Sequence, residues 1–222
     1  MAEKTMDQET MDKKKNDLIT KYLSDMAGLE EHIYQAIDKQ AKGTEDQPEC
    51  NQVLKSIRDT LEVHVTTLNT RLEALGGHPG NPVKQAGSAV LGVAAGVIDK
   101  IRAEELSKDL RDDYTALNLS SISYVMLATT ALACNDKETA DLAEQHLTDN
   151  AGFVIEIGKI IPDVVVQDLS DFTDINKNAA KQARAIYSNA WSQDGGQQKP
   201  SGSQNGQPAQ KIGAASGNGS TF

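Results

Sequence analysis

The chain has 222 residues and carries 32 acidic against 22 basic side chains, which gives it a formal net charge of −10. An acidic surface repels phosphate backbones, and aromatic residues, which stack on unpaired bases, make up only 4% of the chain, so the composition argues against nucleic-acid binding as a main role. The length predicts one domain with terminal extensions.

The N-terminal part of the chain predicts an arm followed by a long helix. Residues 1–15 are charged and polar without an apolar period, which is typical of a mobile arm. Over about residues 16–41 the apolar side chains recur at helical spacing, and Gly43 marks the end of this first helix. Glu30 falls within that apolar stripe.

A second helix is predicted over about residues 49–75, where leucine and isoleucine form a stripe that runs beside His64. Pro48 stands near its start, and the run GGHPGNP, residues 76–82, ends it. Residues 85–102 are rich in glycine and alanine, and we predict a short extra helix there that packs across the long ones.

The second half of the chain predicts three further helices. The third covers about residues 103–133, and the fourth covers about residues 137–161 and ends before Pro162. His146 and Asp149 share the apolar stripe of the fourth helix. A fifth helix is predicted over about residues 164–191.

The C-terminal composition predicts disorder. Residues 192–222 are dominated by Gly, Ser, Gln, Asn and Pro, which bury too little apolar surface to order a segment. No segment has a strand pattern, so the predicted fold class is all-α, with a helical domain over residues 16–191.

Two further features bear on the compartment. Cys50 and Cys134 form no motif, so a disulfide framework is not indicated. The N-terminus lacks the apolar core of a signal peptide, and the longest run of low charge, residues 85–98, is too short to span a bilayer. We therefore predict a cytoplasmic protein that does not associate with membranes.

Ionisable side chains within the apolar stripes are the main functional signal. Burying a carboxylate or an imidazole is costly unless a partner compensates for the lost water. Several such groups that face one another inside a four-helix bundle are typical of a metal site. Each residue also has a structural interpretation: Glu30 can pair with a base such as Arg58, and His64 and His146 can be interior histidines with hydrogen-bond partners.

Four segments carry a resemblance to a known family: YLSDMAGLEEHIYQAIDK, LEVHVTTLNTRLEALGG, LRDDYTALNLSSISYVMLATTALA and ADLAEQHLTDNAGFVIEI, one from each long helix in order. Over about residues 18–165 the chain resembles the YciE/YciF-type branch of the ferritin-like superfamily, a group of bacterial stress-associated proteins. The resemblance implies an antiparallel four-helix bundle, often dimeric, with room for a di-metal centre between the helices.

The ligand set that the resemblance implies is only partly present. In the superfamily, one Glu from each of the first and third helices joins a Glu-x-x-His pair from each of the second and fourth. Glu30 matches the position in the first helix. In the second helix, alignment by the LEALGG end gives Asp59 and Glu62, whereas the apolar period favours His64, and both registers stay open.

The third and fourth helices depart further from that ligand set. The position in the third helix falls near residues 117–120, which contain no carboxylate, and Asp113 is the nearest acid on that face. Tyr124 offers a hydroxyl, which is a weak ligand when protonated. The fourth helix offers an imidazole followed by a carboxylate, the reverse of the usual order. The candidate metal ligands are Glu30, Glu62, His64, His146 and Asp149.

The incomplete ligand set favours a structural or interaction role for a ferritin-like protein over catalysis. The alternative is a di-metal protein that binds iron or manganese with the candidate ligands and handles iron, dioxygen or peroxide. We expect a homodimer, and a protein partner could bind through the C-terminal tail.

Overall fold

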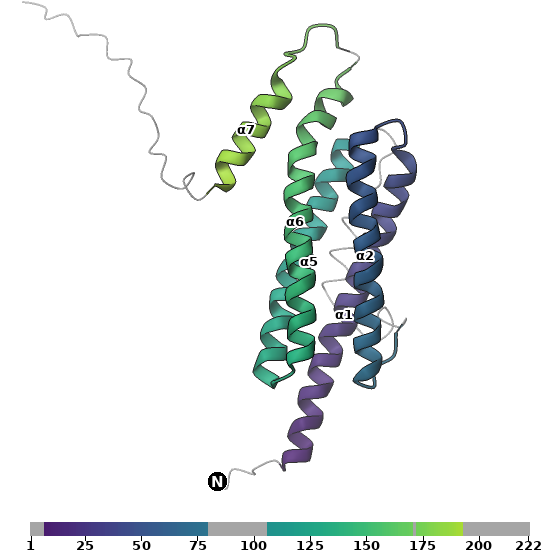
Figure 1. Ribbon diagram of the computed structural model, residues 1–222, viewed down its shortest axis with the longest axis vertical. Helices are drawn as coiled ribbons and strands as arrows, with labels where there is room; N and C mark the ends of the chain where they lie inside the picture. Colours follow the sequence, from purple (N-terminus) through teal and green to yellow (C-terminus); the bar gives the residue numbers. More distant parts are fainter. Residues whose placement is uncertain (1–6, 80–105, 171, 193–222) are drawn as a thin grey trace, which may run out of the picture.

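The computed structural model describes residues 7–79, 106–170 and 172–192. These residues contain five helices and no strand, which confirms the predicted all-α fold class for this part of the chain. The helices, labelled in Figure 1, are α1 (Gln8–Gly43), α2 (Pro48–Ala74), α5 (Leu106–Cys134), α6 (Lys137–Asp168) and α7 (Ala179–Trp191).

The four long helices form a bundle of two hairpins. α1 packs against α2 and α5, and α6 packs against α5 and α2. α1 and α2 run in opposite directions, as do α5 and α6, and α5 begins at the end of the bundle opposite to the one where α2 ends (Figure 1). Each helix is therefore antiparallel to both neighbours, and the second hairpin begins at the end of the bundle opposite to the one where the first hairpin ends.

Aliphatic side chains fill the space between the hairpins. Leu23 of α1, Leu61 of α2, Leu117 of α5 and Ile157 of α6 have no exposed surface. Burying one such side chain stabilises the fold by about 1.5–3 kcal/mol. The predicted apolar stripes thus form the core, and the polar residues within them are buried with it.

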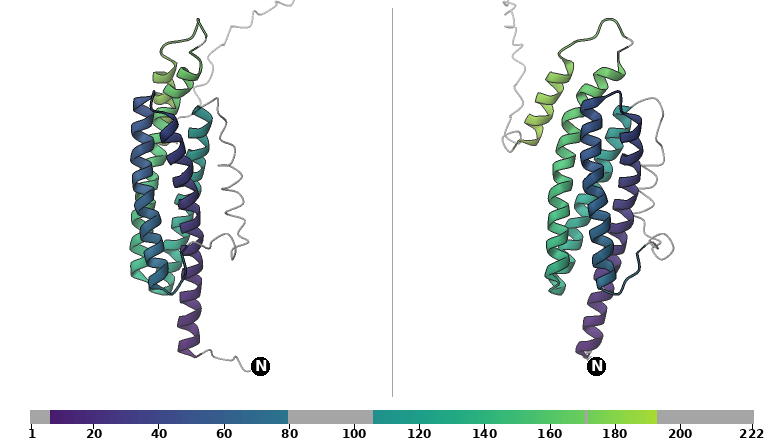
Figure 2. Two further views of the ribbon diagram at one scale, coloured as in Figure 1. Left: turned by 90° about the vertical axis from the view of Figure 1, so that its right-hand side faces the viewer. Right: turned by 45° about the vertical axis from the view of Figure 1, so that its right-hand side comes forward.

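The first helix begins earlier than the sequence pattern predicts. α1 starts at Gln8, so residues 8–15, which we placed in a mobile arm, are helical. The side chain of Asp7 accepts a hydrogen bond from the Thr10 backbone N–H at 2.8 Å and caps this start. Both views of Figure 2 show that the first turns of α1 project beyond the other helices, which is why they carry no apolar period.

The fourth and fifth predicted helices have different boundaries in the structure. α6 continues through Pro162 to Asp168, although an interior proline costs a helix about 3 kcal/mol. Val164 is only 4% exposed, and its burial holds the last turns in place. The predicted helix over 164–191 is therefore divided in the structure: residues 164–168 complete α6, residues 179–191 form α7, and the single continuous helix is wrong.

The turns between helices agree better with the sequence. Gly76, after α2, has a φ of 80°, which favours glycine. Asn135, between α5 and α6, has a φ of 61°, a conformation that asparagine tolerates better than most residues. The short helix predicted over residues 85–102 and the tail beyond residue 192 lie outside the described residues, and both stay predictions.

Composition alone gives an ambiguous signal for α5. Its best 18-residue window has a mean hydropathy of 1.4, so the helix is long and apolar enough to cross a membrane, a test that the core helix of a soluble protein also passes. In this structure α5 is one of the four bundle helices: one face contributes Leu117 and Tyr124 to the core, and 28% of that window is buried.

Candidate functional site

Polar side chains from all four long helices meet at mid-height of the bundle, and we call this set the polar layer. Its buried members are at most 4% exposed, while Thr67 and Asp149 stand at its edge. The polar layer comprises Glu30 of α1, His64 and Thr67 of α2, Ser120 and Tyr124 of α5, and His146, Asp149 and Asn150 of α6.

The carboxylate of Glu30 is the innermost charge and is fully hydrogen-bonded. Its Oε1 accepts from the Ser120 hydroxyl and from Asn150 Nδ2, the latter at 3.1 Å. Its Oε2 lies 3.3 Å from Nδ1 of His64. Burial raises the pKa of Glu30, but the hydrogen bond and charge of His64, together with the other two donors, outweigh burial and lower that pKa below its usual value.

His64 bridges two carboxylates from different helices. Nδ1 faces Glu30, and Nε2 lies 3.2 Å from Oδ2 of Asp149. A carboxylate only accepts hydrogen bonds, so each ring nitrogen must carry a hydrogen. An imidazolium at this position, with a hydrogen on each ring nitrogen, would place one positive charge between two negative ones. Asp149 also accepts from Gln145 Nε2 at 3.1 Å.

His146 has two hydroxyl partners instead. The Tyr124 hydroxyl lies 2.9 Å from Nδ1, and the Thr67 hydroxyl lies 3.0 Å from Nε2. The Thr67 hydroxyl is also within 3.1 Å of the Val63 carbonyl and 3.0 Å of the His64 carbonyl, and a hydroxyl that donates its one hydrogen to either carbonyl accepts from Nε2–H. The phenol then donates to Nδ1, which makes His146 a neutral Nε2–H tautomer.

The electrostatics agree with this assignment of hydrogens. Burial, reinforced by the charge of His64, lowers the pKa of His146 to about 4, so the ring is neutral at physiological pH. Burial and the negative charge of Glu30 raise the pKa of Tyr124 well above 10, so it stays a phenol. The two imidazole rings stack with centroids 3.8 Å apart and planes 12° from parallel.

Comparison with known proteins places this bundle in a family. The model of the family "Domain of unknown function (DUF892)" matches residues 14–170, which include the four-helix bundle and every member of the polar layer. The chain belongs to the DUF892 family. Members of this family are ferritin-like in general.

A solved structure supports the fold of this DUF892 chain. The crystal structure of a protein from Xanthomonas campestris pv. campestris matches it with a TM-score of 0.59 and 18% sequence identity, covering 71% of this chain and 97% of that chain. At this level of sequence identity the match supports a shared fold and nothing further. No curated protein matches the chain.

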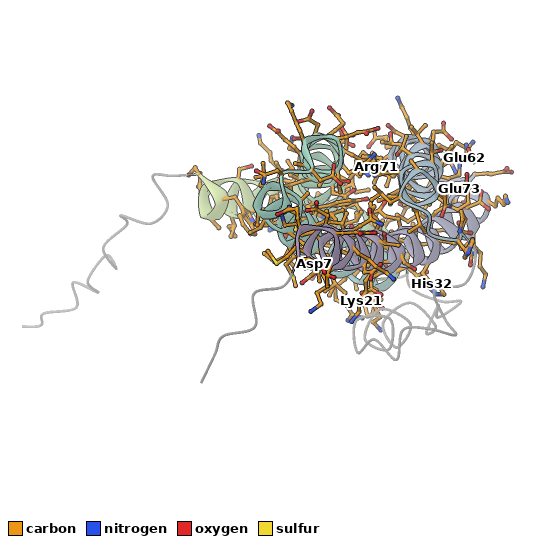
Figure 3. All side chains as sticks on the ribbon, turned by 90° about the horizontal axis from the view of Figure 1, so that it is seen from below. Asp7, Lys21, His32, Glu62, Arg71 and Glu73 are labelled. Carbon is orange, nitrogen blue, oxygen red and sulfur yellow. The ribbon has the colours of Figure 1, made fainter. Side chains whose placement is uncertain are left out.

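The polar layer brings together four of the five candidate metal ligands of this DUF892 chain. Glu30, His64, His146 and Asp149 all belong to it. Glu62 does not, because it is exposed on α2 and lies at the periphery of the bundle in Figure 3. The apolar period thus identified the inner residue of α2 better than alignment by the end of the helix.

The remaining members of the layer are harder to recognise in a sequence. Ser120 occupies the region of the third helix where the resemblance implies a carboxylate, and Asn150 follows a candidate ligand directly. Thr67 was missed altogether. The signal that could have found it is its position one turn after His64, which places both on one helix face.

The arrangement does not fit the di-metal centre that ferritin-like proteins can hold. Imidazole nitrogens bind metals through lone pairs in the ring plane at about 2.0–2.1 Å. The lone pairs of nearly parallel rings run side by side and do not converge on one ion. Both ring nitrogens of His64, moreover, already face carboxylates, and both oxygens of Glu30 already have hydrogen-bond partners. Among the described residues, no group of three or more His, Cys, Asp or Glu side chains has metal-site geometry.

Proposed function

We propose that this DUF892 protein is a YciE/YciF-type, ferritin-like stress-associated protein with a structural or interaction role. A protonated histidine then takes the place of the metal cations. The observation that carries the proposal is the position of His64, whose two N–H groups face carboxylates from α1 and α6.

Charge supports this proposal. Carboxylates gathered inside a bundle require a compensating cation, because burying an unpaired charge is costly. In a di-metal protein the ions supply that positive charge. Here the imidazolium of His64 supplies it between Glu30 and Asp149, while Ser120 and Asn150 donate to the remaining oxygen of Glu30.

Two measurements on the full chain test the proposal. Nitrogen-15 NMR at pH 7 should show both ring nitrogens of His64 protonated and His146 as a neutral Nε2–H tautomer. Elemental analysis after loading with Fe²⁺ or Mn²⁺ should find far less than one ion per chain, with an unchanged melting temperature.

The alternative is an iron- or manganese-binding protein that handles iron, dioxygen or peroxide. Finding one or two ions per chain, lost in Glu30→Ala, would overturn the structural proposal in favour of that alternative. The Glu31→Ala variant is the matched control, because its carboxylate lies outside the layer and bonds to Gln35.

We further propose that two copies of the chain associate through α5. Its outer face exposes Ile122, Val125 and Met126, each at least 42% accessible, at spacings of three and four residues. The Ile122→Lys variant should dissociate the dimer in sedimentation experiments, whereas Val63→Lys on α2 should not. A monomeric wild-type protein, or a dimer insensitive to the first substitution, would contradict this assignment.

A further inference from the structure

A second buried polar pair joins α1 to α5 away from the polar layer. Gln40 is 7% exposed and Asp113 is 2% exposed. Nε2 of Gln40 donates to Oδ1 of Asp113 at 3.0 Å. Asp113 precedes Ser120 by two helical turns, so the pair shares no partner with the layer and does not depend on the function proposed for it.

The same two side chains each keep one atom without a partner. Oε1 of Gln40 and Oδ2 of Asp113 are both buried, and neither has a hydrogen-bond partner. The pair already shares one hydrogen bond. One additional hydrogen placed between the two unsatisfied acceptors would give both of them a partner. A carboxylic acid group carries such a hydrogen, whereas a carboxylate does not.

We infer that Asp113 is held as a neutral carboxylic acid whose O–H donates to Oε1 of Gln40, closing an acid–amide ring with two hydrogen bonds. The ring satisfies all four polar atoms of the two side chains. The ring makes this contact between α1 and α5 pH-sensitive, because loss of the acid hydrogen breaks one of the two hydrogen bonds and leaves a buried charge.

The surroundings of Asp113 favour the neutral form. Burial raises its pKa to about 8 against the opposing effect of the Gln40 hydrogen bond, and the nearby carboxylates of Asp109 and Asp112 on α5 add to the rise. On α2, burial and the charge of Asp113 raise the pKa of Cys50 to about 11, so the thiol stays neutral over the same range. Gln40, on α1, carries no charge.

The direction of the pH dependence follows from the two pKa values. In the unfolded chain Asp113 titrates near 3.8, whereas in the folded protein it titrates at about 8. Between these values the folded state binds one proton more than the unfolded state, so this group makes stability fall as pH rises. Above pH 8 the contribution of Asp113 to the free energy of unfolding no longer changes with pH.

The Asp113→Asn variant tests the inference, because an asparagine amide can donate to Oε1 of Gln40 and keep the ring at any pH. Its melting temperature should match that of the wild type near pH 4 and exceed it increasingly as pH rises to 8, by up to about 2–4 °C for each pH unit. Asp17→Asn, which removes an exposed carboxylate near the other end of α1 from Gln40, is the control and should give a difference that does not grow with pH.

A second measurement does not depend on the variant. The carbon-13 signal of the Asp113 carboxyl in the wild-type protein should titrate with a midpoint near 8. A midpoint near 4, or an Asp113→Asn variant that is less stable at every pH, would overturn the inference, because either result means that Asp113 is ionised in the folded protein.

Discussion

His64 shows how one side chain can determine the state of its neighbours. Because both of its nitrogens donate to carboxylates, its charge helps to keep Glu30 ionised and His146 neutral. The phenol of Tyr124 and the hydroxyl of Thr67 then take the orientations that a neutral His146 requires. The hydrogen positions of the layer thus follow from a single protonation state.

Removing the charge of Glu30 should destabilise the protein strongly. Glu30→Gln keeps the size of the side chain but leaves the imidazolium of His64 without its innermost partner. Breaking a buried pair in this way costs about 3 kcal/mol or more. Urea unfolding at pH 7 measures the loss, and Glu31→Gln, whose carboxylate lies outside the layer and bonds to Gln35, should change stability by less than about 0.5 kcal/mol. Similar midpoints for the two variants would contradict the pairing.

Removing the hydroxyl of Thr67 should also destabilise the protein, but by less than removing the charge of Glu30. Thr67→Val preserves shape but leaves Nε2–H of His146 without an acceptor, which costs about 1–3 kcal/mol. Thr66→Val, at the adjacent exposed position, loses only a hydrogen bond to the Glu62 carbonyl and should stay within about 0.5 kcal/mol of wild type. Equal unfolding free energies for the two variants would contradict the assigned tautomer.

The sequence predicted the ionisable members of the layer because they interrupt apolar stripes. Glu30, His64, His146 and Asp149 stand out in this way, since a charge there needs a partner. Thr67 and Gln40 do not stand out, because neutral polar residues are common at the edge of a stripe. Their roles depend on which side chain of another helix lies opposite, and the periodicity of one helix carries no such information.

At the scale of helices, Arg71 joins the end of α2 to the start of α6. Its guanidinium donates to Asp136 at 2.7 Å, to Glu138 at 2.5 Å and to Thr139 Oγ1 at 2.9 Å. Asp136 also caps α6 by accepting from the Thr139 backbone N–H. In Figure 3 Arg71 lies on the side of α2 that faces α6. This clasp holds the two hairpins together at one end.

Arg71→Met should therefore destabilise the bundle by about 2 kcal/mol, because charge-assisted hydrogen bonds to partly buried groups are lost. Arg111→Met is the control, since that side chain is 63% exposed and pairs with its neighbour Asp112. Thermal unfolding of both variants measures the difference. An Arg71 variant as stable as the control would show that the clasp contributes little.

The docking of α7 on α6 depends on a glycine. A Cβ atom at Gly158 would overlap the ring of Tyr187, whose hydroxyl lies 3.5 Å from the Val154 carbonyl. Within α7 only Ala180 is buried, so the docking depends on few contacts: this one and the ion pair of Arg184 with Asp163 of α6 are two of them. The close approach was not visible in the sequence, which shows a glycine but not what lies above it.

Gly158→Ala should loosen α7 even though alanine favours a helix by about 1 kcal/mol over glycine. Gly152→Ala is the matched control on the same helix, because nothing lies near its Cβ position, and it should stabilise α6. Hydrogen exchange over residues 179–191 should become faster in the first variant and stay unchanged in the second. Slower or unchanged exchange in Gly158→Ala would contradict the docking contact.

At the scale of the molecule, opposing pKa shifts set the pH of greatest stability. The lowered pKa values of Glu30 and Asp136 make stability fall as pH drops below about 4.5. Between pH 4 and 6.5, His146, with its pKa lowered from 6.5, and Asp113, with its pKa raised, act in opposite directions and nearly cancel. Above pH 6.5 only Asp113 remains of these two, and stability falls again toward pH 8.

Melting temperatures measured from pH 3 to 9 should therefore show a broad maximum between about pH 4.5 and 6.5. Glu30→Gln should have a shallower decline on the acid side, and Asp113→Asn a shallower decline on the alkaline side. A maximum at pH 8 in the wild type would contradict this balance.

The polar layer also determines how the two hairpins align along the bundle axis. Sliding one hairpin by a helical turn moves its side chains about 5.4 Å. Leucine and isoleucine would meet other aliphatic side chains after such a slide, but Glu30 would lose Ser120 and Asn150, and His64 would lose Asp149. Misaligned bundles would thus bury unpaired charges, and we expect the layer to select one alignment during folding by penalising the others.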